Sequence, residues 1–109
     1  MSAYVKRLKH LLGAACDAVS LGVPSFDEAT ASFTVPRSGV EVVREPGVTG
    51  GFMWRVREVY EVPDLQRGGH QPIEDVIVEL AMGDEVEAVR QAVLRAVARQ
   101  IEVALDSAA

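Results

Sequence analysis

The feature that most constrains the fold is a helical pattern in the last quarter of the chain, residues 84–106. Five apolar residues recur there at steps of three or four positions: Val86, Val89, Val93, Val97 and Ile101. This spacing predicts an amphipathic helix of about six turns with one apolar face. Gly83 ends the preceding segment, and Asp84 with Glu87 three positions later predicts an acidic capping box. A helix of this kind needs an apolar surface to pack against, which the rest of the chain must supply.

A second helical pattern lies at the N-terminus, where apolar residues recur at helical spacing between positions 4 and 19. Gly22 and Pro24 predict the end of this helix. The apolar run that follows His10 is cut by Asp17, which is too early for the core of a secretion signal. No apolar stretch approaches the roughly 20 residues that span a bilayer. We therefore expect a cytoplasmic protein with no membrane partner.

Between the two helices the apolar residues alternate with a period of two, which predicts β-strands. The predicted strands are residues 30–35, 40–45, 52–62 and 75–82. In the last of them Val76, Val78, Leu80 and Met82 are predicted to face inward, and Asp75 and Glu79 outward. Residues 36–39 and 46–51 carry turn chemistry, and the aperiodic run 63–72 predicts a longer, mobile loop. Short connections favour an antiparallel meander. The sequence thus predicts one α+β domain over residues 1–109, a two-layer sandwich with both helices on one face of a four-stranded sheet.

Charge and composition restrict the classes of partner. The net charge is −5 at pH 7 and the pI is about 4.9, so the average field repels phosphate backbones, and we expect no nucleic-acid partner. The single cysteine, Cys16, cannot form an internal disulfide, and its position predicts a small apolar residue at the border of the core. Lysine occurs only twice while arginine and alanine are abundant, a bias that is typical of bacterial or phage genes with high GC content.

One carboxylate breaks the pattern of the long central strand. Glu58 has the parity of Val56 and Tyr60, which predicts an inward position where an unpartnered charge is costly. A β-bulge beside Arg57, or the end of the sheet, would return Glu58 to water, and this is the interpretation we favour. A buried ion pair and a functional carboxylate with a perturbed pKa are the two alternatives.

No catalytic or metal-binding motif is present in the sequence. His70 stands alone in a Gly-Gly-His-Gln-Pro run, without a nucleophile or further ligands at diagnostic spacing. The glycine-containing loop at residues 47–51 lacks the Lys-Ser/Thr and the following helix that a phosphate loop requires. We therefore expect a protein that is not an enzyme and that uses no catalytic residue, metal or cofactor.

The remaining hypothesis is a small interaction or assembly domain, such as an adaptor, an inhibitor, a chaperone-like protein or a structural component. Its partner is another protein or a second copy, bound through the last helix or an edge strand. Candidate interaction residues are charged side chains of the outer sheet face and of the last helix: Arg55, Arg57, Glu79, Arg90, Arg95 and Arg99. Arg55 and Arg57 are also predicted to pair across strands with Glu79 or Glu74. The alternative function is a ligand-binding or enzymatic pocket lined by Trp54, Glu58 and Tyr60.

Overall fold

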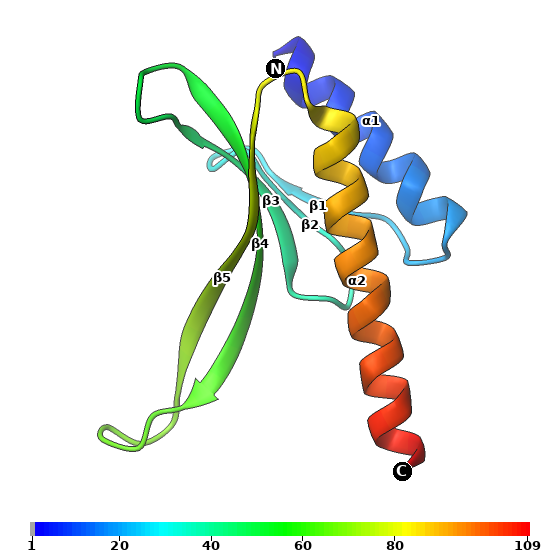
Figure 1. The fold of residues 1–109 in the computed structure, drawn as a ribbon, viewed down its shortest axis with the longest axis vertical. Coiled ribbons are helices and arrows are strands. Elements are labelled where there is room, and N and C mark those ends of the chain that lie inside the picture. The colour runs from blue at the N-terminus through cyan, green and yellow to red at the C-terminus, as the bar shows by residue number, and fades with distance from the viewer. Residues whose placement is uncertain (1) are drawn as a thin grey trace.

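The computed structural model describes residues 2–109 and has the predicted α+β architecture. Along the chain, a helix comes first and last, and the strands of an antiparallel sheet come between them. In space, both helices lie on one side of this sheet (Figure 1). The elements are α1 (Ala3–Ala18), β1 (Ser25–Asp27), β2 (Ser32–Thr34), β3 (Val40–Pro46), β4 (Phe52–Pro63), β5 (His70–Ala81) and α2 (Glu85–Ala108). The strands form one meander in the order β1-β2-β3-β4-β5. The sheet thus has five strands, one more than predicted.

Strand β1 was missed because three residues are too few to show alternation. Ser25 and Asp27 are exposed, and only Phe26 faces the protein. The ring of Phe26 stacks on Phe33 of β2 with 4.5 Å between the ring centroids. One aromatic contact and the ladder with β2 therefore extend the sheet at this edge.

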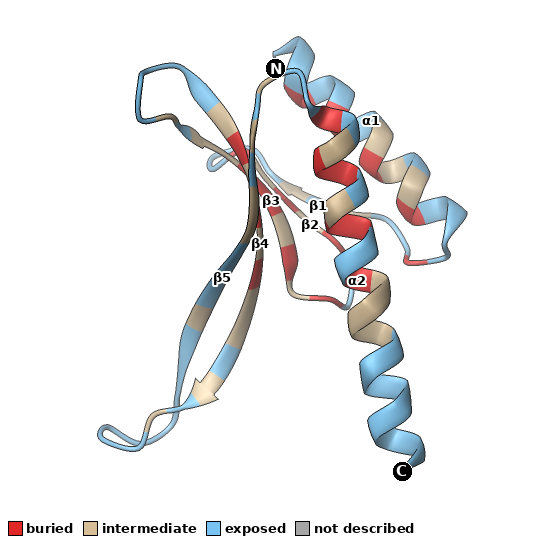
Figure 2. Cartoon of the chain, in the orientation of Figure 1, coloured by how far each residue is buried: buried red, intermediate tan, exposed pale blue. Residues whose placement is uncertain are grey.

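Both helices cover the same face of the sheet, and the buried residues lie between these two layers (Figure 2). Helix α1 contributes large side chains, whereas α2 contributes small ones. The buried residues of α1 are Val5, Leu8, Leu12 and Cys16, and those of α2 are Glu85, Ala88, Val89, Ala92, Val93 and Ala96. The three alanines of α2 leave room for α1 to pack against it. Burial raises the pKa of the Cys16 thiol, which behaves as the predicted small apolar residue.

The capping-box prediction for α2 is wrong. The Asp84 side chain makes no capping hydrogen bond, and Glu87 bonds instead to Arg90 and Gln91. Glu85, which follows Asp84, turns inward and is fully buried. Its Oε2 accepts hydrogen bonds from the Gly83 backbone N–H at 2.6 Å and from Trp54 Nε1 at 2.8 Å. The helix start is therefore fixed to the sheet through the indole of Trp54.

The β4–β5 hairpin is longer than predicted, and its end diverges from α2 (Figure 1). Residues 63–72 were predicted to form a mobile loop, but the ladder continues to the pair Pro63 and His70. Only residues 64–69 form the turn, which closes with hydrogen bonds between Asp64 and Gly69 and between Gly68 and Asp64, both 2.9 Å long. Because this end of the hairpin leaves the core, its sequence lacks the alternation that burial imposes.

The register shifts by one residue where β5 passes Val56 and Arg57 of β4. As a result Val76 pairs with Arg57 and is 48% exposed, so its predicted inward position is wrong. Ile77 packs against the core instead. The bulge is therefore on β5, and the parity of β4 is unbroken.

Candidate functional site

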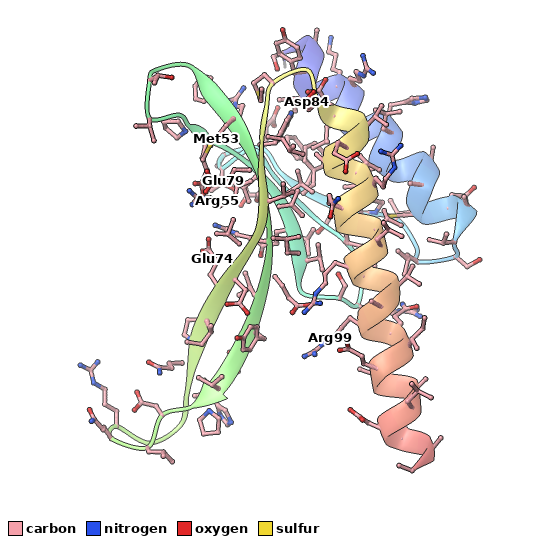
Figure 3. The ribbon with its side chains drawn as sticks, in the orientation of Figure 1. Met53, Arg55, Glu74, Glu79, Asp84 and Arg99 are labelled. Atoms are coloured by element: carbon pink, nitrogen blue, oxygen red, sulfur yellow. The ribbon has the colours of Figure 1, made fainter. Side chains whose placement is uncertain are left out.

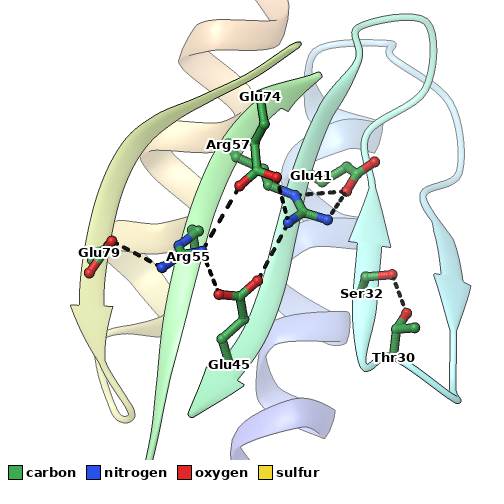
Figure 4. A network of polar contacts seen from close by, with 8 residues as sticks. All are labelled: Thr30, Ser32, Glu41, Glu45, Arg55, Arg57, Glu74 and Glu79. Atoms are coloured by element: carbon green, nitrogen blue, oxygen red, sulfur yellow. Dashed lines mark hydrogen bonds and ion pairs between the residues drawn. The ribbon is translucent and has the colours of Figure 1, made fainter. Parts of the chain in front are cut away.

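The outer face of the sheet, away from the helices, carries Met53, Arg55 and Glu79 (Figure 3). Arg55 and Arg57 lie side by side here among glutamates from β3 and β5 (Figure 4). Arg55 contacts Glu45 at 2.6 Å and Glu79 at 3.3 Å. Arg57 contacts Glu41 at 2.9 Å and Glu74 at 3.1 Å. The predicted pairing of the two arginines with Glu74 and Glu79 is confirmed.

Glu41 and Glu45 were missed as partners, because only the β3–β4 register brings them to the arginines. Burial lowers the pKa of Arg57, but its hydrogen bond to Glu41 and the nearby carboxylates outweigh this, and the pKa is raised. Four carboxylates thus surround two guanidinium groups that are already paired. Both arginines are therefore paired within the network, which keeps a formal excess of two negative charges.

On the inner face, Glu58 is buried with 3% of its surface exposed, so the prediction that a bulge returns it to water is wrong. Arg95 of α2 donates to both of its oxygens, from Nη2 to Oε1 at 3.0 Å and from Nε to Oε2 at 3.2 Å. This bidentate pair raises the pKa of Arg95. The second alternative for Glu58, a buried ion pair, is therefore what the structure contains.

A polar hollow of about 230 Å³ lies between the hairpin and α2, lined by Glu58, Tyr60, Asp75, Arg95 and Arg99. The Tyr60 hydroxyl donates to Asp75 Oδ2 at 3.0 Å. Two carboxylates and two guanidinium groups balance each other here. The structure thus brings together Glu58 and Tyr60 of the predicted pocket.

Trp54, the third residue of the predicted pocket, is fully buried in the core and is bonded to Glu85. It does not line the hollow. Asp75, which was predicted to face outward, is opposite Glu58 in the register and does line it. Among residues 2–109 there is no group of three His, Cys, Asp or Glu side chains arranged to hold a metal ion. In the same range, no helix is long and apolar enough to cross a membrane.

The Tyr60–Asp75 hydrogen bond has a measurable consequence. Asp75 raises the pKa of Tyr60, because its carboxylate accepts a hydrogen bond from the phenol and repels the phenolate. In a Tyr4→Phe background, ultraviolet titration should therefore show Tyr60 ionising above pH 10. Asp75→Asn should move this transition toward the ordinary value. A titration that is unchanged by Asp75→Asn would show that the bond does not persist in solution.

We refer to residues 94–108 as the second half of α2. The charged residues of this half lie on the side of the hairpin. Arg95 and Arg99 line the hollow, and Figure 3 shows Arg99 extending toward the hairpin. Arg99 also contacts Glu102 at 3.5 Å. With 3.6 residues per turn, Arg95, Arg99, Glu102 and Asp106 share one face of the helix.

The solvent side of the same half carries apolar residues. Leu94, Ile101 and Leu105 are 60%, 54% and 65% exposed, and their mean direction is about 110° around the helix from that of the charged residues. The last turns of α2 are exposed on all sides (Figure 2). The prediction that Ile101 faces the core is therefore wrong, and so is that for Val86, which is also exposed. We define the α2 outer face as Leu94, Val97, Ile101, Ala104, Leu105 and Ala108, with Val97 at its border, where it also packs against the core.

The chain matches no known family model, no curated protein and no solved structure. The geometry of its own residues is therefore the basis for a proposal of function. Two features stand out from it, the charge-balanced hollow and the α2 outer face.

Proposed function

We propose that this protein is a small assembly domain that binds another polypeptide through the α2 outer face. The observation that supports this is the reversed amphipathicity of the second half of α2. Charged residues face the hairpin, where Arg95 meets Glu58, while Leu94 and Ile101 face solvent. An exposed apolar stripe of this kind is typical of a surface that a partner covers.

Energetics support the same interpretation. Helix α2 has 24 residues, its buried residues end at Ala96, and its last two turns, residues 101–108, are exposed throughout. An isolated helical segment of this length is marginal in water without tertiary packing. A partner on the outer face would bury apolar surface at about 25 cal/mol per Å² and would hold these turns in the helix.

In this proposal the candidate charged residues do not bind the partner directly. Arg95 and Arg99 fix which side of α2 faces the hairpin, and Arg90 lies at the start of the outer face, where it pairs with Glu87. On the far side of the sheet, Arg55 pairs with Glu79 and Arg57 pairs with Glu41. These residues therefore orient and solubilise the domain, and the apolar stripe supplies the contact.

The alternative function, an enzymatic or ligand-binding pocket, has less support. Arg95 occupies both oxygens of Glu58, and Asp75 accepts from Tyr60. We therefore propose a non-enzymatic role as an adaptor, an inhibitor, a chaperone-like protein or a structural component of a bacterium or phage. A cytoplasmic location belongs to this proposal, because the buried thiol of Cys16 needs no oxidising compartment.

Site-specific photocrosslinking in the cells that make this protein tests the proposal. A photoreactive side chain replaces Leu94 or Ile101, and the control places it at Leu65, which is apolar and fully exposed in the hairpin turn. We expect a discrete protein adduct from both α2 positions and none from position 65. The absence of an adduct, or equal adducts from all three positions, would contradict a binding role for the α2 outer face.

A further inference from the structure

We infer that the polypeptide on the α2 outer face is a second copy of this chain, whose α2 packs antiparallel against the first. This inference rests on the proposed function and identifies the partner. A face that binds its own copy around a two-fold axis must be complementary to itself. The spacing, the flanking residues and the charges of α2 each meet this requirement.

The spacing of the face fits a helix as its partner. Positions 90, 94, 97, 101, 104 and 108 follow alternating steps of four and three, which is the 3.5-residue repeat of a coiled-coil seam. From Leu94 to Ala108 this seam is about 21 Å long at 1.5 Å per residue. A straight helix keeps such a seam in contact with another helix over two heptads.

The residues beside the seam contain no charge. Six positions flank it between residues 91 and 107, and all are neutral: Gln91, Val93, Ala98, Gln100, Leu105 and Ser107. The charges of this half lie at Arg95, Arg99, Glu102 and Asp106, on the hairpin side. From Leu94 to Ala108, a second α2 can therefore approach without burying an ionised group or meeting a like charge.

Charge selects the antiparallel orientation. Arg90 is the only ionised residue in the seam, so a parallel pair would place the two copies of Arg90 against each other. In an antiparallel pair each Arg90 reaches the last turn of the other helix. That turn has no basic residue, contains Asp106 and is the negative end of the helix dipole. The two helix dipoles are then also opposed.

The free edge of β5 is a poorer route to self-association. It is interrupted by the bulge at Ile77 and carries Pro72, which has no N–H to donate. It also carries Glu74 and Glu79, so two copies paired edge to edge would bring carboxylates together. These are features that protect an edge strand from pairing.

Light scattering of the purified protein over a wide range of concentration tests the inference. We expect twice the chain mass of 11.7 kDa, falling to one chain mass on dilution. The double variant Leu94→Glu/Ile101→Glu should remain at one chain mass throughout. The matched control is Val103→Glu, on the same exposed end of α2 but about 160° around the helix from Ile101, which should leave the dimer intact. Circular dichroism of each variant at equal dilution confirms that it is folded.

Disulfide trapping tests the orientation. In an antiparallel pair centred between Val97 and Ile101, position 94 of one copy lies near position 104 of the other. Leu94→Cys mixed with Ala104→Cys should give a crosslinked dimer on oxidation, and neither variant should do so alone. Cys16 is fully buried and does not compete. Crosslinking of each variant with itself would overturn the antiparallel arrangement.

The two proposals fail in different ways. A purified protein that stays monomeric at every concentration overturns self-association. If the photocrosslinked adduct then has the mass of one other protein, binding by the α2 outer face stands and the second copy as its partner does not. If no adduct forms at Leu94 or Ile101 either, both proposals are wrong.

Discussion

Replacing Gly39 by alanine is expected to lower the free energy of unfolding by about 3 kcal/mol. Gly39 precedes β3 with φ +71°, a left-handed conformation that costs most other residues about 1 kcal/mol or more. A Cβ at this position would lie 2.5 Å from the carbonyl oxygen of Val59. Neither group can move away easily, because the Val59 N–H donates to the Gly39 carbonyl at 2.8 Å.

The matched control for this variant is Gly50→Ala. Gly50 also has a positive φ of +93°, but no atom lies within 4 Å of the position its Cβ would take. This control therefore measures the backbone strain alone, which we expect to be about 1 kcal/mol. Chemical denaturation of both variants gives the difference, and equal losses would show that Gly39 makes no close contact with Val59.

The period of the apolar residues predicts most of the fold. Buried positions such as Leu8 and Leu12 in α1, and Val56 in β4, follow the helical and strand periods and were assigned to the right elements. The pattern fails where burial ends. Pro63 and residues 70–72 join a ladder whose two faces are both exposed to water, so nothing in their polarity marks a strand.

The bulge on β5 could not be located from the sequence, because a one-residue shift leaves the composition of both faces plausible. The favoured interpretation placed the irregularity on β4 beside Glu58, whereas the structure places it at Ile77. The signal that could have identified the partner of Glu58 is Arg95. Arg95 lies among apolar residues of α2, as Glu58 does in β4. Two opposite charges that each depart from an apolar pattern favour an ion pair.

The α2 outer face was not recognised from the sequence, because the apolar residues of this helix were read as one continuous stripe. Val89 and Val93 belong to the core face, whereas Val86 and Ile101 are exposed. A helical-spacing rule accepts steps of three or four without tracking the accumulated angle. The three steps of four from Val89 to Ile101 add about 120°, so the rule joined residues from two faces. The positions of the charges Arg95, Arg99 and Glu102 separate the two faces, and they are present in the sequence.

The ion pair between Glu58 and Arg95 is expected to behave asymmetrically when its partners are removed. Arg95→Met should lower the free energy of unfolding by about 3 kcal/mol, because it leaves the Glu58 carboxylate buried without a partner. Glu58→Met should cost less, since Arg95 is partly exposed and can turn to water. The double variant should recover most of the loss, because two apolar side chains replace the pair.

Denaturation of the four proteins measures this cycle. Additive losses would show that the pair does not stabilise the fold. The result also bears on assembly. Arg95 is the contact that turns the charged side of α2 toward the hairpin, so a strong coupling to Glu58 means that the outward direction of Leu94 and Ile101 is built into the folded monomer.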